Sequence, residues 1–99
     1  MDLPIDDERA PIYSVGQVSG MLGLQPAFLR RLDTEDVVRP GRSSGGQRRY
    51  SRSDITTVAR VADMAADGFS LAGIRRVLEL ELEVAALKAE LDAQRRKHA

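Results

Sequence analysis

The chain has 99 residues, with 15 Lys and Arg, 15 Asp and Glu and one His, so its formal net charge at pH 7 is zero. This length gives room for one domain with a modest core and argues against a large catalytic pocket. Because the sequence has no cysteine, thiolate metal sites, disulfides and redox switches are excluded as well.

The charge is unevenly distributed along the chain. Residues 1–27 hold one Arg and four acids, residues 28–60 hold eight Arg and four acids, and residues 61–99 hold six basic and seven acidic side chains. The net charges of these segments are therefore −3, +4 and −1. The guanidinium group of arginine can bind phosphate oxygens and guanine edges through two hydrogen bonds at once, so the middle segment is the candidate surface for a polyanion.

The N-terminal segment, MDLPIDDERAP over residues 1–11, is charged and contains two prolines, which predicts a disordered arm. The N-terminus is acidic where a secretory signal is basic. No apolar run approaches the length of a membrane span. We therefore expect a cytoplasmic protein.

Two short helices are predicted next. Ser14 followed by Gln17 has the spacing of a capping box, and apolar residues recur at helical intervals over about residues 14–22. Gly23 can take the positive φ that ends a helix, and a proline three residues later suits the first turn of a second helix over about residues 26–33. A short helix, a Gly-containing turn and a second helix are the signature of a helix-turn-helix.

The second predicted helix has an apolar face made of Phe28, Leu29 and Leu32. Arg30 and Arg31 are adjacent in it and lie about 100° apart around the helix axis, so at least one of them points into solvent. These two arginines either contact DNA or are ordinary solvated helix charges.

A β-hairpin is predicted in the segment VVRPGRSSGGQRRYS, residues 37–51. Its β-prone ends, residues 37–39 and 47–50, flank a mobile stretch of Pro, Gly and Ser. In a winged helix-turn-helix such a hairpin, the wing, lies along the sugar-phosphate backbone, where glycines allow close approach and arginines neutralise phosphate. The alternative is an ordinary surface hairpin whose arginines promote solubility.

Two further helices complete the chain. Ser51 and Asp54 again have capping-box spacing, and an apolar stripe predicts a third helix over residues 52–67, with Phe69 packed into the core after it. The stripe consists of Ile55, Val58, Ala59, Ala62 and Ala66. A serine cap then precedes a long final helix over about residues 71–95.

The final helix carries apolar residues at alternating spacings of three and four, which form a heptad seam of two repeats. The seam consists of Val77, Leu80, Val84, Leu87 and Leu91. The third helix lies too far upstream to cover the last two leucines, so a coiled coil with a second copy is favoured over packing back onto the same domain. Because two heptads make a marginal coiled coil, we expect additional contacts from the globular part.

Motifs of enzyme chemistry are missing from the sequence. It contains no phosphate-binding or dinucleotide-binding glycine motif and no zinc-protease motif, and its one histidine, His98, lies in the tail, which excludes a Ser-His-Asp triad. The adjacent acids at 6–7 and 35–36 lie in a predicted tail and a predicted turn, without an apolar pocket to shift a pKa. We expect no enzyme activity, no cofactor and no metal.

Taken in order, YSVGQVSGMLGLQPAFLRRLDTEDVVRP followed by SSGGQRRYSRSDI resembles the MerR family of bacterial transcription regulators, over about residues 12–74. Family members have a second helix of the pattern LR-aromatic-acid, a Gly-containing turn, an apolar pair with a proline, and a Gly-rich wing ending in Arg-x-Tyr. The matching residues are Leu29, Arg30, Asp33, Val37, Val38, Pro40, Arg48, Arg49 and Tyr50. Leu32 replaces the usual Tyr or Trp, which removes a common backbone contact. Asp36 replaces the usual Gly, at a turn whose left-handed geometry Asp tolerates.

Within the family, the runs GGQRRYSRSDI and SLAGIRRVLELE and the short C-terminus look most like the heat-shock repressor (HspR-like) subgroup. This resemblance implies a repressor of chaperone genes, with a DnaK-type chaperone or RNA polymerase as a protein partner. Eight residues follow Leu91, where most family sensors carry a ligand or metal domain. A signal is therefore expected to arrive through a partner protein, temperature or concentration, or not at all.

The expected fold is mainly α: a MerR-type winged helix-turn-helix with a small β-hairpin wing in residues 12–75, a coiled-coil dimerisation helix in residues 76–95 and a tail in residues 96–99. The expected function is a sequence-specific double-stranded DNA-binding regulator that acts as a homodimeric repressor on a near-palindromic operator. The expected DNA-binding residues are Gln25, Ala27, Phe28, Arg30 and Arg31 of the second helix and Arg42, Ser44, Arg48, Arg49 and Tyr50 of the wing.

Two other functions fit the same sequence. An excisionase-like factor that bends DNA uses a similar winged module, although such factors often assemble as filaments without a dimerising helix. A protein-interaction adaptor would use the coiled coil for a different partner and carry an incidental basic hairpin. A discrete inverted-repeat footprint would indicate the regulator, and an extending footprint would indicate the DNA-bending factor. No retardation of DNA at low salt would indicate the adaptor.

Overall fold

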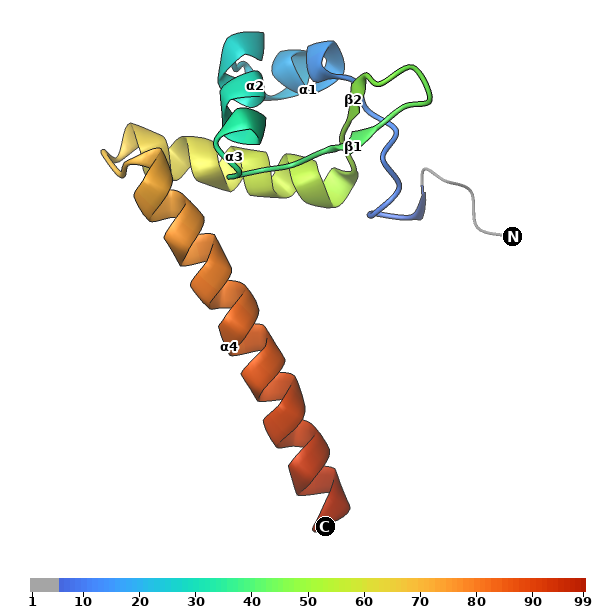
Figure 1. Cartoon of the computed structure of the whole chain (residues 1–99), viewed down its shortest axis with the longest axis vertical. Coiled ribbons are helices and arrows are strands. Elements are labelled where there is room, and N and C mark those ends of the chain that lie inside the picture. The colour runs from blue at the N-terminus through green and yellow to red at the C-terminus, as the bar shows by residue number, and fades with distance from the viewer. Residues whose placement is uncertain (1–5) are drawn as a thin grey trace.

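The computed structural model describes residues 6–99, in which four helices and a two-stranded antiparallel sheet are formed (Figure 1). The elements are α1 Val15–Leu22, α2 Pro26–Thr34, β1 Gly41–Arg42, β2 Arg48–Arg49, α3 Arg52–Ala66 and α4 Leu71–Lys97. α1, α2 and the hairpin lie on one side of α3, and α4 projects away from them. The predicted winged helix-turn-helix with a long C-terminal helix is confirmed.

The predicted caps position the first three helices. Ser14 with Gln17 at α1, and Ser51 with Asp54 at α3, form capping boxes in which each side chain accepts a hydrogen bond from the backbone amide of its partner. Gly23 ends α1 with a φ of 65°, in the left-handed region that favours glycine. The turn between α1 and α2 is thereby kept short, as a helix-turn-helix requires.

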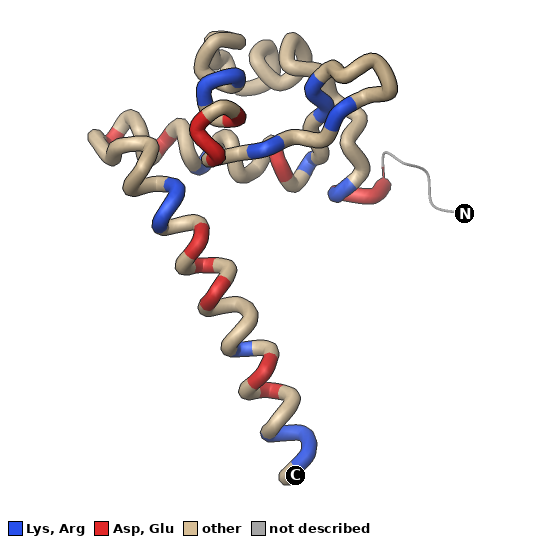
Figure 2. The backbone as a smooth tube through the Cα atoms, in the orientation of Figure 1, with Lys and Arg blue, Asp and Glu red and all other residues tan. Residues whose placement is uncertain are grey.

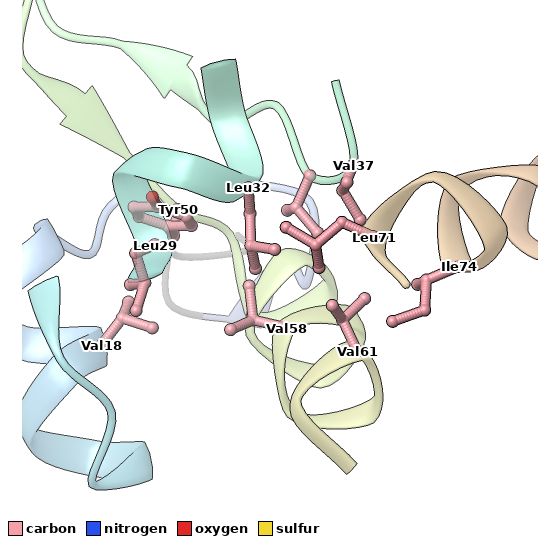
Figure 3. Close-up of a cluster of buried hydrophobic side chains, with 10 residues drawn as sticks. Val18, Leu29, Leu32, Val37, Tyr50, Val58, Val61, Leu71 and Ile74 are labelled. Atoms are coloured by element: carbon pink, nitrogen blue, oxygen red, sulfur yellow. The ribbon is translucent and has the colours of Figure 1, made fainter. Parts of the chain in front are cut away.

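Ten buried apolar residues from all the helices and the wing form one core (Figure 3). They are Val18, Leu29, Leu32, Val37, Val38, Tyr50, Val58, Val61, Leu71 and Ile74. Leu32 is fully buried, so the residue that departs from the family pattern packs in the core and presents no surface to a ligand.

The predicted strand over residues 37–39 is wrong. Val37 and Val38 are buried, and both of their amides donate hydrogen bonds to the carbonyl oxygen of Leu32. These two β-branched residues therefore pack in the core beneath α2, and tertiary packing overrides their strand propensity. The strands begin only at Gly41 and are two residues long.

The predicted burial of Phe69 is also wrong. Its side chain is 55% exposed, and Leu71 and Ile74 on the first turn of α4 enter the core instead. Gly68, with a φ of 97°, turns the chain sharply at the end of α3. The helical period of α4 then decides which apolar residues face α3.

The N-terminal segment is anchored from Asp6 onwards. The amide of Ser53 donates to the carbonyl oxygen of Glu8 at 2.9 Å, and the Arg52 guanidinium donates to the carbonyl oxygen of Asp6 at 3.0 Å. The first amides of a helix have no hydrogen-bond partner within the helix, and the N-terminal segment supplies an acceptor for one of them in α3. The prediction of a disordered arm is therefore wrong for residues 6–11, and the five residues before them lie outside the described residues.

Asp36 is the only non-glycine residue with positive φ, 59°, among residues 6–99. It lies in the turn after α2, where its amide donates to the carbonyl oxygen of Asp33 and its carboxylate lies 3.0 Å from the guanidinium of Arg39. The expectation that this aspartate adopts left-handed geometry is confirmed.

We expect Asp36→Ala to have a free energy of unfolding about 1 kcal/mol lower than Asp36→Gly, because a left-handed backbone is unfavourable for alanine and not for glycine. Asp36→Asn should lie close to the wild type, since its short side chain also bonds locally. Urea denaturation at equal protein concentration measures the difference. Equal stabilities of the alanine and glycine variants would contradict the left-handed turn.

α4 leaves the domain without cover from its own chain. Every residue from Glu79 to Asp92 is exposed, and the seam residues Leu80, Val84, Leu87 and Leu91 are between 41% and 64% exposed. The radius of gyration of 16.0 Å exceeds the ~13 Å of a compact chain of this length, because α4 projects. None of the helices within residues 6–99 is both long enough and apolar enough to span a bilayer.

An ion pair with two hydrogen bonds joins α4, about three turns from its start, to α3. The Nη1 and Nη2 atoms of Arg60 each lie 2.5 Å from a carboxylate oxygen of Glu81. Hydrogen bonding between the two groups raises the pKa of Arg60 and lowers the pKa of Glu81. This pair and the buried Ile74 fix the direction in which α4 leaves the domain.

Candidate nucleic-acid interface

The wing is tied to α2 by one carboxylate. Asp33 Oδ2 accepts hydrogen bonds from Arg42 Nη2 at 2.8 Å and from Arg48 Nε at 2.6 Å. The Asp33 side chain is 11% exposed and that of Arg48 is 21% exposed. Among the ion pairs of residues 6–99, this one is the best shielded from water, so it is less weakened by solvent than an ordinary surface pair.

The wing and the start of α1 line one cavity of about 390 Å³. Ser14, Val15 and Gly16 form its α1 side, and the three wing arginines form the other. These arginines are Arg42, Arg48 and Arg49. The first amides of a helix carry a partial positive charge, so the cavity is electropositive from both sides and suits a phosphate group.

The basic residues of α2 and the wing lie on the same side of α3 (Figure 2). Arg30 and Arg31 are both exposed. Arg31 Nε lies 2.5 Å from Glu35 Oε2, whereas Arg30 forms no ion pair among the described residues. Arg30 therefore has its full charge available for a ligand, and Arg31 would first have to leave Glu35.

The other predicted contact residues differ in exposure. Gln25 and Ala27 are exposed at the start of α2, and Gln25 makes no side-chain capping bond, so its amide is available to a ligand. Ser44 is exposed at the wing tip. Phe28 is half-buried against the core. Arg49 is half-buried too, and donates to the Arg48 carbonyl oxygen at 3.2 Å. Apart from Phe28, these side chains remain candidates for DNA contact.

Tyr50 does not lie on the predicted DNA-binding surface. Its side chain is 1% exposed, and its hydroxyl has no hydrogen-bond partner within residues 6–99. Its backbone pairs with Tyr13, each amide donating to the carbonyl oxygen of the other. Tyr50 therefore anchors the wing to the core and to the segment before α1, because the aromatic ring gains more from burial than from a surface position.

We expect Tyr50→Phe to raise the free energy of unfolding by about 1 kcal/mol, because the buried hydroxyl loses its water without gaining a partner. Burial raises the pKa of Tyr50 above its ordinary value of 10.0. The wild type should therefore keep its full stability below pH 10.0 and lose part of it as the pH rises further, since the unfolded state then releases the proton first.

Urea denaturation of both proteins at about pH 8 and about pH 11 measures these effects. The stability gap should widen at the higher pH, and the titration of Tyr13 cancels because both proteins contain it. A Tyr50→Phe protein that is less stable than the wild type at pH 8 would show that the hydroxyl has a partner.

The family model described as MerR HTH family regulatory protein matches residues 13–81 of the chain. This match covers α1, α2, the wing, α3 and the first turns of α4, which is more than half of the chain. The chain belongs to the MerR family. Its resemblance to that family, read from the helix-turn-helix and wing motifs, is confirmed.

The chain is similar to proteins named as a heat shock protein and as a transcriptional regulator. The chain is 41% identical over 83 residues to the putative heat shock protein HspR of Streptomyces coelicolor, covering 83% of this chain and 55% of that protein. It is 28% identical over 88 residues to the HTH-type transcriptional regulator GlnR of Bacillus anthracis, covering 86% and 68%. The chain thus spans about half the length of the Streptomyces relative.

Two solved structures share the fold. One is MtaN, the N-terminus of the Bacillus subtilis multidrug transporter activator, with a TM-score of 0.63, 22% identity and coverage of 87% of this chain and 89% of that one. The other is HiNmlR, a MerR family regulator lacking the sensor domain and bound to promoter DNA, with a TM-score of 0.63, 22% identity and coverage of 81% and 78%.

Sequence reasoning missed the part that Asp33 plays. The residue matched the acid of the MerR pattern, but its partners lie nine and fifteen positions downstream, in the wing. No helical or strand period relates residues at those spacings. The available signal was an acid two residues after an arginine pair, within the positively charged segment.

Proposed function

We propose that this chain is a sequence-specific double-stranded DNA-binding transcriptional regulator that acts as a homodimer on a near-palindromic operator. The observation that carries the proposal is the basic surface formed by α2, the wing and the start of α1, which Asp33 joins. Helix α2 enters the major groove, and the wing and α1 lie along the flanking backbone. HiNmlR, which shares the fold and is bound to promoter DNA, supports the proposal of DNA binding.

Three exposed residues of α2 and its cap are proposed to contact base edges. Gln25 and Arg30 supply the side-chain groups that pair with adenine and guanine in the major groove, and Ala27 can contact a thymine methyl group. Arg42, Arg48 and Arg49 are proposed to bind phosphates, which fix orientation and carry no sequence information. Arg31 completes the phosphate contacts once it leaves Glu35.

The homodimer is proposed to form through α4. Its seam leaves four large apolar side chains in water, and a second copy packed on it would remove that surface from solvent. A pair of two-heptad helices is marginal alone, so contacts near the corner between α3 and α4 contribute as well. The paired helices hold the two copies of α2 at one distance, which sets the half-site spacing of the operator.

The regulatory role is proposed to be repression of stress genes in the cytoplasm, on DNA of the nucleoid. The similarity to the putative heat shock protein HspR supports this role. On this proposal, a DnaK-type chaperone and RNA polymerase are the expected protein partners. Co-purification from heat-shocked cells tests both. Deletion of the gene should raise transcripts beside the bound sites, and lowered transcripts would contradict repression.

Selection of bound fragments from a random double-stranded pool, followed by footprinting, tests the DNA-binding proposal. We expect one motif with inverted half-sites and a protected region of fixed length. A footprint that extends cooperatively with protein concentration would support the DNA-bending alternative. Failure to retard any fragment in dilute buffer would contradict DNA binding and support the adaptor.

A further inference from the structure

Asp33 is an acid placed inside a surface proposed to bind phosphate. A carboxylate there repels the polyanion, so affinity alone does not explain it. Its side chain lies outside the apolar core, yet it is almost completely covered, because Arg42 and Arg48 of the wing close over it. The residue therefore acts on the wing rather than on the ligand.

The geometry of the two ion pairs leaves donors free. Arg48 uses Nε to reach Asp33, so both of its Nη groups keep their N–H donors for another acceptor. Arg42 uses Nη2 for Asp33, and its Nη1 makes only a 3.4 Å contact with the carbonyl oxygen of Gly46. Asp33 thus orients both guanidinium groups without consuming them.

The wing has little else to hold its angle relative to α2. Its strands pair over two residues each, and a two-stranded hairpin of this size is at best marginally stable alone. Its other anchor is Tyr50 at the base of β2, whose ring is buried in the core and whose backbone pairs with Tyr13. Asp33 is the contact that joins the arginine-bearing part of the wing to the helix that reads bases.

We infer that Asp33 is a positioning residue that determines specificity, an inference that rests on the proposed function. When Asp33 holds the wing to α2, the wing contacts phosphates in the one register on the DNA that also aligns α2 with its base edges. Without these ion pairs, the wing can bind the backbone of any duplex while α2 is out of register. Loss of Asp33 should weaken operator binding and leave non-specific binding as strong or stronger, since one negative charge is gone.

Asp33→Asn tests the inference, with Glu35→Gln as its matched control. Both changes remove one negative charge near the end of α2, but Glu35 pairs only with Arg31 and not with the wing. The probes are the fragment that the wild type selects from a random pool and a scrambled duplex of the same composition. The affinity ratio of selected to scrambled DNA should fall on the order of tenfold in Asp33→Asn and stay unchanged in Glu35→Gln.

A second readout follows the wing in the free protein. Because the chain has no cysteine, Ser44→Cys places a single spin label at the wing tip. The label should move more freely when Asp33→Asn is added, and Asp33→Glu, which restores a carboxylate, should recover part of the ordering and of the affinity ratio. Urea denaturation of each variant confirms that the fold is kept, and Asp33→Ser takes the place of Asp33→Asn if that variant does not fold.

The outcomes separate this inference from the proposed function. A wild type that selects no fragment contradicts both. A selective wild type whose affinity ratio is unchanged in Asp33→Asn contradicts the inference alone, as does a parallel loss of affinity for both probes. A fallen ratio with greater label mobility supports it.

Discussion

Replacing Leu87 by glutamate should split the homodimer and lower operator affinity by about a hundredfold or more. Leu87 is 64% exposed in the single chain and belongs to the proposed seam. Pairing would bury two unpaired carboxylates, which is strongly unfavourable. A monomer must then bind each half-site separately and loses the gain from linked binding. Sedimentation equilibrium and titration of the selected fragment measure both losses.

Leu82→Glu is the matched control for that variant. Leu82 is 73% exposed on the same helix, five residues earlier, and its position in the heptad lies outside the seam. It should keep the dimer and most of the operator affinity. If Leu82→Glu dissociates the dimer and Leu87→Glu does not, the seam has been assigned to the wrong face of α4.

The second large effect is the response to salt. If each copy places about four arginines on phosphates, a dimer neutralises about eight, and operator affinity should fall on the order of a thousandfold or more between about 50 and 200 mM salt. Arg49→Ala should reduce the slope of log affinity against log salt by about two per dimer. It should also weaken all sequences alike, because a phosphate contact carries no base information.

Arg49 is the sharpest probe of this effect because it is not paired with Asp33, whereas replacing Arg48 would also leave that carboxylate with one partner fewer. Lys88→Ala is the control, since it removes a positive charge from exposed α4, away from the wing. Its slope should match the wild type. An unchanged slope in Arg49→Ala would remove Arg49 from the phosphate contacts.

Much of the fold followed from local rules that the chain obeys. The capping boxes at Ser14 and Ser51 depend on a partner three residues away, and the turn at Gly23 on a glycine after the last apolar residue, so spacing and residue type predict them. The left-handed turn at Asp36 was expected from the resemblance to the family, in which Gly is usual at this position. The exposed seam of α4 is likewise a property of one helix.

The errors came where tertiary contacts decide. Val37 and Val38 have the composition of a strand, but α2 offers them a core position and a carbonyl acceptor. Phe69 is apolar, but the direction of α4 brings Leu71 into the core in its place. Both outcomes depend on how the elements pack against one another, which the local sequence does not determine.

In the candidate site too, some features follow from the local sequence and others only from tertiary contacts. The exposure of Gln25, Ala27 and Arg30 on α2 agrees with their predicted position on the helix. The burial of Tyr50, and the bonds from Arg42 and Arg48 to one carboxylate, arise only when the wing folds back onto α2. The exposed positions on α2 could therefore be predicted, whereas the contacts that join the wing to Asp33 could not.

Site-directed DNA cleavage tests the central claim most directly, that α2 and the wing of two copies form one surface for a duplex. Single cysteines at Ala27, Ser44 and Lys88 can each carry an iron-chelate reagent, because the chain has none of its own. On the selected operator, the α2 reagent should cut inside each half-site, the wing-tip reagent should cut at the outer flanks, and both patterns should be symmetric about the operator centre. The account would be contradicted if the reagent at Lys88 cut the operator as strongly as the other two. It would also be contradicted if the α2 and wing-tip reagents did not cut at the same half-sites.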